Sequence, residues 1–250
     1  MDSSMNIARI TSTPIYVDYL PPLGPYQGSN AAGPVWGSTA LIVKLETAGG
    51  VVGWGEGTGQ MEMDVSALLN GHHVGDIEAA LARMEEAGIP YGPISGIEMA
   101  MWDARGKLED APLHVLLGGA VRTEIALSEY FGFRLPAATE QGEQTPEEIA
   151  DYCARMVDEH GATSFEGKVA TVDLDTEVRM IRLIREAIGD RQLKVDANGG
   201  WTVQTARHAI ARMDDYDIHY YEEPVETYEE MAQLRPFTKA SFSTHIMDLP

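Results

Sequence analysis

Apolar residues recur with two different periods along the chain, and the pattern changes near residue 120. Before that point, short β-rich runs indicate a small antiparallel sheet, followed by helical spacing over residues 76–117 that Pro90–Gly96 interrupts. The predicted strands are Ile7–Tyr16, Thr39–Glu46 and Val51–Glu56, the last two joined by a turn at Gly49-Gly50. A long segment rich in Pro and Gly, residues 19–37, separates the first two strands, and such loops are usually functional or mobile.

After Gly118-Gly119, predicted strands and helices alternate. The strands are Ile125–Phe133, Ser164–Ala170, Gln192–Ala197, Ile218–Val225 and Ser241–Ile246. The helices between them are Thr145–His160, Leu174–Ile188, Val203–Met213 and Tyr228–Phe237. Alternation of this kind predicts a parallel sheet, either closed as a barrel or open and doubly wound. No glycine fingerprint for a nucleotide follows the first strand, so we favour a barrel over residues 123–250, preceded by a separate domain over residues 1–122.

Polar or ionisable side chains stand at the ends of four consecutive predicted strands. They are Glu166 and Lys168, then Asp196 and Asn198, then Glu222, then His245. Parallel strands lie about 4.8 Å apart, so carboxylates at the same height on neighbouring strands can converge on one divalent cation. Taken alone, each feature has a simpler interpretation, such as a helix-capping turn, a solvated lysine or a structural histidine. Their coincidence at one edge of the sheet predicts a metal site.

Composition and charge limit the classes of partner that the chain is expected to bind. The chain has 18 basic and 39 acidic residues, a net charge of −21 that argues against nucleic-acid binding. No apolar run approaches the roughly 18–20 residues of a membrane span, so we expect no membrane partner. The first residues lack a secretory pattern, and the single cysteine, Cys153, fits a reducing compartment. We therefore expect a cytoplasmic protein.

Two stretches of this sequence resemble a known family. Residues 93–103, PISGIEMAMWD, followed by residues 112–119, PLHVLLGG, resemble the mandelate racemase and muconate lactonizing enzyme branch of the enolase superfamily. The series Lys168, Asp196-Ala197-Asn198 and Glu222-Glu223-Pro224 resembles that branch in order and spacing. The resemblance implies an α+β capping domain and a modified (β/α)7β barrel. It also implies an essential Mg²⁺ that stabilises the enediolate formed when a base removes the proton α to a carboxylate.

The resemblance implies roles for several residues. Asp196 and Glu222 correspond to metal ligands, and Lys168 to the general base. The substrate would be a small carboxylate, and homo-oligomers are common in such a family. We further expect residues 19–37 to form a lid over the barrel mouth, with Tyr26 and Trp36 available to line a pocket.

Two positions depart from the family pattern. Glu166 replaces the first lysine of a Lys-x-Lys motif, and a like charge about 4 Å from a substrate carboxylate costs roughly 4 kcal/mol at an effective dielectric of 20. We therefore expect Glu166 to contact a different substituent of the substrate. The region 234–245 resembles glucarate-type acid-sugar dehydratases and places His245 as third ligand, with Asp248 as the fallback. An imidazole suits Mn²⁺ or another divalent ion better than Mg²⁺.

Three functions remain open at this stage. The first is dehydration of an acid sugar or other hydroxy acid, and the second is racemisation or epimerisation of a hydroxy or amino-acid-like carboxylate. The third is a truncated, non-catalytic chain, because only about half of the roughly 250 residues of a complete barrel follow Glu124. We therefore expect strands 1–5 of an incomplete barrel.

Overall fold

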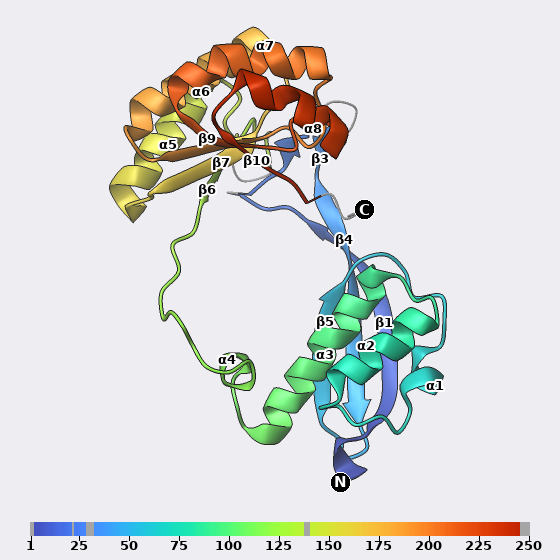
Figure 1. Ribbon diagram of the computed structural model, residues 1–250. Helices are drawn as coiled ribbons and strands as arrows, with labels where there is room; N and C mark the ends of the chain where they lie inside the picture. Colours follow the sequence, from blue (N-terminus) through green and yellow to red (C-terminus); the bar gives the residue numbers. More distant parts are fainter. Residues whose placement is uncertain (1–2, 22, 29–32, 138–140, 246–250) are drawn as a thin grey trace. The chain divides into compact units, whose positions relative to one another are not determined.

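The computed structural model describes the chain except for residues 1–2, 22, 29–32, 138–140 and 246–250. The chain separates into two compact units (Figure 1). The first unit comprises Met1–Val17 and Ser38–Glu124, and the second comprises Asp18–Gly37 and Ile125–Pro250. The segment 19–37 thus groups with the second unit. No helix among the described residues is long and apolar enough to cross a membrane.

The first unit is a three-stranded sheet with helices packed on one face. Its strands are β1 (Ile7–Asp18), β4 (Gly37–Thr47) and β5 (Val52–Gly57), in the order β1-β4-β5, with β4 and β5 antiparallel. The helices are α1 (Val65–Leu69), α2 (Ile77–Glu86), α3 (Tyr91–Glu109) and α4 (Leu113–Leu116), after a short 3-10 turn at Ser3–Met5. Every second residue of β4 from Leu41 to Thr47 is buried, as expected for a strand with one covered face.

Helix α3 lies directly on β5 because the strand presents glycine there. A Cβ atom added to Gly55 would lie 2.0 Å from the carbonyl oxygen of Gly96, and one added to Gly53 would lie 2.0 Å from that of Ala100. The expected interruption at Pro90–Gly96 is therefore wrong. Pro90 is the N-cap residue, and the helix runs unbroken from Tyr91, because its glycines serve close packing rather than a turn.

The second unit contains a five-stranded parallel sheet, which confirms the predicted alternation. The strands are β6 (Glu129–Phe131), β7 (Ser164–Lys168), β8 (Gln192–Asp196), β9 (Ile218–Glu222) and β10 (Ser241–Ser243), in the order β10-β9-β8-β7-β6. The helices are α5 (Pro146–His160), α6 (Leu174–Ile188), α7 (Val203–Met213) and α8 (Tyr228–Leu234), with 3-10 turns at Asp214–Tyr216 and Arg235–Phe237. The helices lie along one face of the sheet (Figure 1).

The two faces of this sheet differ in chemistry. Phe165, Val195 and Tyr221, on the helix-covered face, are buried in the apolar core. Residues one position away along each strand point to the opposite face, and most of those are polar or ionisable. The helices therefore pack on the apolar face of the sheet, and the ionisable side chains lie on the other face.

Residues 19–37 contain more structure than expected. Two short strands, β2 (Tyr26–Gln27) and β3 (Pro34–Val35), pair antiparallel within this segment. The backbone also joins the chain beyond β6, since Gln27 N donates to the Phe133 carbonyl at 2.8 Å and Leu135 N donates to that of Pro25 at 2.8 Å. This part of the segment is thereby fastened beside the end of β6.

Candidate active site

Three ionisable residues stand side by side at the carboxyl ends of β7, β8 and β9. Lys168 is paired in register with Asp196, and Asp196 with Glu222. We call these three residues the carboxylate rung. They lie on the face of the sheet opposite the helices, so the structure brings together three of the residues that the sequence placed in one site.

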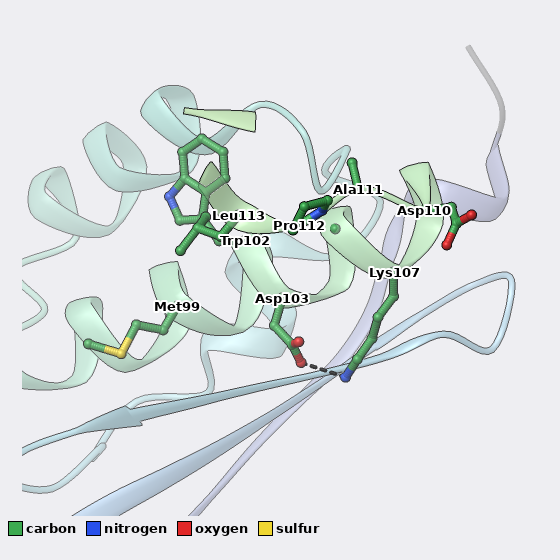
Figure 2. A pocket seen from close by; sticks show the side chains of 9 residues that line it. Met99, Trp102, Asp103, Lys107, Asp110, Ala111, Pro112 and Leu113 are labelled. Atoms are coloured by element: carbon green, nitrogen blue, oxygen red, sulfur yellow. Dashed lines mark hydrogen bonds and ion pairs between the residues drawn. The ribbon is translucent and has the colours of Figure 1, made fainter. Parts of the chain in front are cut away.

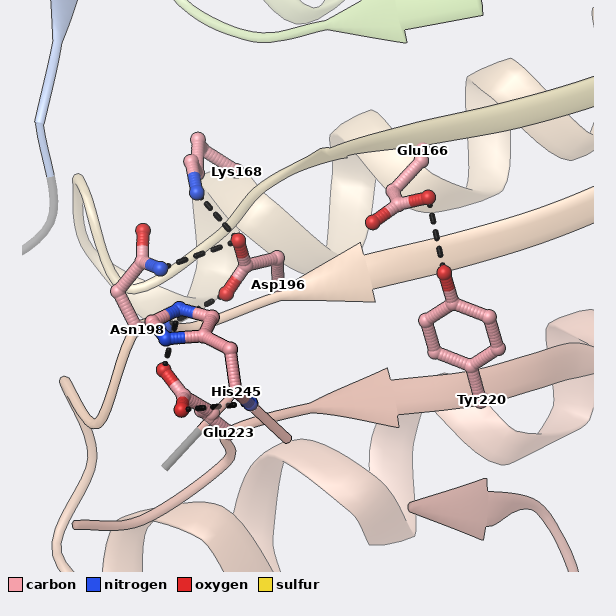
Figure 3. A network of polar contacts seen from close by, with 7 residues as sticks. All are labelled: Glu166, Lys168, Asp196, Asn198, Tyr220, Glu223 and His245. Atoms are coloured by element: carbon pink, nitrogen blue, oxygen red, sulfur yellow. Dashed lines mark hydrogen bonds and ion pairs between the residues drawn. The ribbon is translucent and has the colours of Figure 1, made fainter. Parts of the chain in front are cut away.

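Asp196 is the most firmly held member of the carboxylate rung. Its side chain is buried and accepts hydrogen bonds from the Lys168 ammonium, from the Asn198 amide at 3.1 Å and from the Asn198 backbone N–H at 2.8 Å (Figure 3). Asn198 has φ 46°, a left-handed conformation that asparagine tolerates better than most residues. Asn198 thus acts in this structure by orienting Asp196.

Glu222 lies beside other carboxylates. Burial, the Asp196 charge and the Glu166 charge, together with a hydrogen bond shared with Glu166, raise the pKa of Glu222 to about 7, while His245 opposes the rise. Like charges disfavour the ionised form, and a cation between them would favour it. Lys168 is the cation that balances Asp196 here.

His245 is turned toward a residue that we did not predict to be functional. Its Nε2 lies 2.9 Å from Glu223 Oε2, and its backbone N–H donates to Glu223 Oε1 at 3.1 Å (Figure 3). Thr244 donates to that same oxygen at 3.1 Å. Buried Glu223 therefore holds the chain that follows β10. Its position directly after Glu222, in the Glu-Glu-Pro sequence, is the signal that could have identified it.

The donor set suits a hard divalent cation. Within the described residues, no group of three or more His, Cys, Asp or Glu is arranged to hold a metal. Asp196 and Glu222 nevertheless offer adjacent carboxylates in need of positive charge, which is the ligand chemistry that Mg²⁺ prefers. Asp248, the fallback ligand, lies outside the described residues.

Glu166 stands two residues before Lys168 on β7, on the same face. Tyr220 Oη donates to its Oε2 at 2.8 Å, and the Lys194 ammonium lies 3.5 Å from that oxygen (Figure 3). Neither Tyr220 nor Lys194 was among the predicted site residues. Their spacing of two from Glu222 and Asp196 is the period that places strand residues on one face, and it could have identified them.

The predicted aromatic residues have different surroundings. The Tyr26 ring stacks on Tyr19 at a centroid distance of 5.9 Å and meets the edge of Tyr130 at 6.1 Å. Burial, Tyr19 and the Asp196 charge raise the pKa of Tyr26, in that order of size, so this phenol stays protonated close to the carboxylate rung. Trp36 is 55% exposed, and its backbone carbonyl accepts from the Tyr19 N–H at 2.8 Å, so its side chain lies mostly in solvent.

A buried carboxyl supports the loop that follows Lys168. Glu177 of α6 accepts hydrogen bonds from the backbone N–H of Thr171 at 2.7 Å and of Val172 at 3.3 Å. Burial raises the pKa of Glu177 to about 7, although those hydrogen bonds oppose the rise. Ala170 in this loop has φ 58°. Glu177 thus holds a strained turn next to the predicted base, a role that depends on tertiary packing.

A hollow of about 530 Å³ lies in the first unit, between α3 and the chain around α4 (Figure 2). Its lining is mostly apolar and includes Met99, Trp102 and Leu113. The charged pair at its edge, Lys107 and Asp103, is joined at 2.6 Å. Lys107 and Asp103 therefore balance each other at the edge of a mostly apolar lining.

Two family models match this chain. Residues 17–118 match the mandelate racemase / muconate lactonizing enzyme N-terminal domain, and residues 148–247 match the enolase C-terminal domain-like family. Together these matches span most of the sequence, and the second includes the whole carboxylate rung.

Curated relatives are 27–29% identical to the chain over the aligned residues. A probable glucarate dehydratase from Streptomyces coelicolor is 27% identical, over 98% of this chain and 64% of the relative. A chloromuconate cycloisomerase from Cupriavidus pinatubonensis is 29% identical, over 79% and 55%. An N-succinyl-L-Arg/Lys racemase from Bacillus cereus is 27% identical, over 92% and 64%. The chain therefore spans less than two thirds of these relatives, and their reactions differ.

Solved structures share the fold. An enolase from Pseudomonas fluorescens Pf0-1, with bound magnesium, potassium and tartrate, superposes with a TM-score of 0.81 at 25% identity. That match covers 98% of this chain and 64% of the other. A muconate lactonizing enzyme from Pseudomonas fluorescens, complexed with muconolactone, gives 0.79 at 23% identity, over 96% and 66%. The five parallel strands thus correspond to part of a barrel.

Proposed function

We propose that this chain removes the proton α to a carboxylate in a metal-dependent reaction, which leads to dehydration of an acid sugar or another hydroxy acid. The chain belongs to the mandelate racemase and muconate lactonizing enzyme branch of the enolase superfamily. The observation that carries the proposal is the carboxylate rung. A lysine and two carboxylates in register at the ends of parallel strands combine a proton acceptor with a cation site. The match to a probable glucarate dehydratase supports the substrate class.

In this proposal Asp196 and Glu222 hold the metal, and His245 is the predicted third ligand. A divalent cation supplies Lewis-acid stabilisation of the negative charge that develops on the oxygens of the substrate carboxylate. Magnesium in the related enolase structure supports that choice of ion. Asn198 orients Asp196 through its two hydrogen bonds, which keeps one ligand in place without the substrate.

Lys168 is the proposed base. Lys168 would act as the neutral amine, once a divalent cation takes over the charge of Asp196. As the C–H bond α to the carboxylate breaks, its proton passes to Lys168 Nζ and the electron pair stays on the substrate. The β-hydroxyl then leaves as hydroxide, which makes water with that proton. The lysine side chain is 16% exposed and reaches Asp196, so Nζ lies within the rung rather than in bulk solvent. The Tyr26 ring meets the Tyr130 ring edge to face at 6.1 Å, and burial together with the Asp196 charge raises the pKa of both phenols.

Exchange of the α-hydrogen in D₂O tests the proposal. With Mg²⁺ and glucarate, the wild-type chain should exchange deuterium into the α-position, as followed by ¹H NMR, and should form a 2-keto product. Lys168→Ala should slow exchange by about 10²–10⁴-fold, the usual contribution of a general base. Lys239→Ala is the matched control, because Lys239 is exposed and lies outside the rung.

Two outcomes would overturn this proposal. One is exchange that is unaffected by EDTA, and the other is equal exchange in wild type and Lys168→Ala. Exchange without a keto product, accompanied by inversion at the α-carbon, would instead support racemisation.

A further inference from the structure

A second row of side chains lies two residues before the carboxylate rung, on the same face of the sheet. Tyr130, Glu166, Lys194 and Tyr220 are partners in register along β6, β7, β8 and β9. We call these four residues the second rung. It combines one acid with one base and two phenols, and the proposed proton transfer does not use its lysine.

The contacts of the second rung converge on one oxygen atom. Tyr220 Oη donates to Glu166 Oε2 at 2.8 Å, and Lys194 Nζ lies 3.5 Å from the same oxygen. Lys194 Nζ also lies 5.4 Å from the centre of the Tyr220 ring, within the range of a cation–π interaction. The Lys194 and Glu166 side chains are 13% and 26% exposed, so solvent screens this ion pair less than a surface pair.

This arrangement decides which kind of substituent Glu166 can accept. Glu166 precedes Lys168 by two residues on the same face of β7, so the second rung lies next to the carboxylate rung. Its charge is already balanced by Lys194. An ammonium group arriving at the remaining oxygen would meet a second cation nearby, whereas a hydroxyl group would meet a neutralised but strong acceptor.

We propose that Lys194 and Tyr220 are positioning residues that hold Glu166 as an acceptor for a hydroxyl group of the substrate. The structure thus favours a polyhydroxy acid over an amino-acid-like, cationic carboxylate. This inference rests on the proposed function, because it takes the substrate to be bound at the carboxylate rung.

Ligand discrimination by the full chain with Mg²⁺ tests the inference, with Kd values measured by isothermal titration calorimetry. The probes are glucarate, adipate (the same six-carbon diacid without hydroxyls) and 6-aminohexanoate. Wild type should bind glucarate at least about tenfold more tightly than adipate, and 6-aminohexanoate weakly. Lys194→Met should bind 6-aminohexanoate about tenfold more tightly than wild type does, because the Glu166 charge is then free. Tyr220→Phe should reduce the preference for glucarate over adipate.

The neighbouring tyrosine supplies a matched control. Tyr221 Oη donates to Asp214 at 2.9 Å on the helix-covered side, so Tyr221→Phe removes a similar hydrogen bond from the opposite face. It should lower the melting temperature without changing the ratio of the glucarate and adipate Kd values. If Lys194 and Tyr220 had only a structural role, their substitution would change the melting temperature and leave the relative Kd values of the three ligands unchanged.

The outcomes separate this inference from the function on which it rests. Mg²⁺-dependent binding of both diacids with equal affinity would overturn the inference alone. The inference alone would also be overturned if the folded Lys194→Met and Tyr220→Phe variants kept the wild-type ratios of the Kd values for the three ligands. Binding of neither diacid in a Mg²⁺-dependent way would overturn both.

Discussion

Replacing Glu177 by glutamine should remove a pH dependence from the stability of the second unit. Glu177 is 1% exposed, and its pKa is raised from 4.5 to about 7, chiefly by burial. The folded protein therefore binds this proton more tightly than the unfolded chain does. The resulting stabilisation is complete below about pH 4.5 and is lost as the pH rises through 7. Glutamine stays neutral, and its carbonyl oxygen can still accept from Thr171.

The size of the effect follows from the shift. Each pKa unit corresponds to about 1.4 kcal/mol, so a rise from 4.5 to about 7 corresponds to about 3 kcal/mol at most. Of this, about 2.5 kcal/mol is lost between pH 5 and pH 8, because the unfolded carboxyl is already partly ionised at pH 5. Between pH 5 and pH 8, the free energy of unfolding of wild type should therefore fall by about 2–3 kcal/mol more than that of Glu177→Gln.

Urea denaturation at the two pH values measures this change. A background with Trp54→Phe and Trp102→Phe leaves tryptophan fluorescence in the second unit, where Trp201 is buried. Glu186→Gln is the control, because Glu186 is an exposed residue of the same helix. An equal pH dependence in wild type and Glu177→Gln, within about 0.5 kcal/mol, would refute a buried, proton-binding Glu177.

Two further predictions concern the close contact in the first unit and the proposed ligands in the second. Gly55→Ala should lower the free energy of unfolding by about 3 kcal/mol in urea denaturation, because its Cβ would lie 2.0 Å from a backbone oxygen that cannot rotate away. Gly132→Ala, whose Cβ would meet nothing closer than 4.0 Å, is the control, and a loss below about 1 kcal/mol at Gly55 would contradict the packing. Saturating Mg²⁺ should raise the melting temperature of wild type but not of Asp196→Asn. Exposed Asp175→Asn should keep the response, and an unchanged response in Asp196→Asn would remove Asp196 from the ligand set.

Local sequence signals predicted much of the second unit. Helix α5 starts at Pro146 with Thr145 as its N-cap, as predicted, because Thr145 and Glu148, three residues apart, form a capping box. The helices Leu174–Ile188 and Val203–Met213 also have their predicted bounds. The expected strand Ile125–Phe133 is paired only over Glu129–Phe131, which is shorter than its neighbour Ser164–Lys168.

The site was predictable only as far as strand positions determine it. Lys168, Asp196 and Glu222 are adjacent because parallel strands end at one edge, which the sequence pattern indicates. The partner of His245 depends on how the chain turns after β9, where Glu223 has φ 38°. The pairing of Glu166 with Lys194 depends on side-chain directions across two strands. Periodicity carries neither kind of information.

The glycine contact between β5 and α3 places the two sides of that helix under different evolutionary constraints. Its inner side touches the strand through backbone atoms, so compensating side-chain changes cannot restore the fit once a glycine is lost. Its outer side, with Trp102, borders the hollow in Figure 2 through side-chain atoms. Residues there can diverge while the helix keeps its place, so related chains can acquire different surfaces on an unchanged first unit.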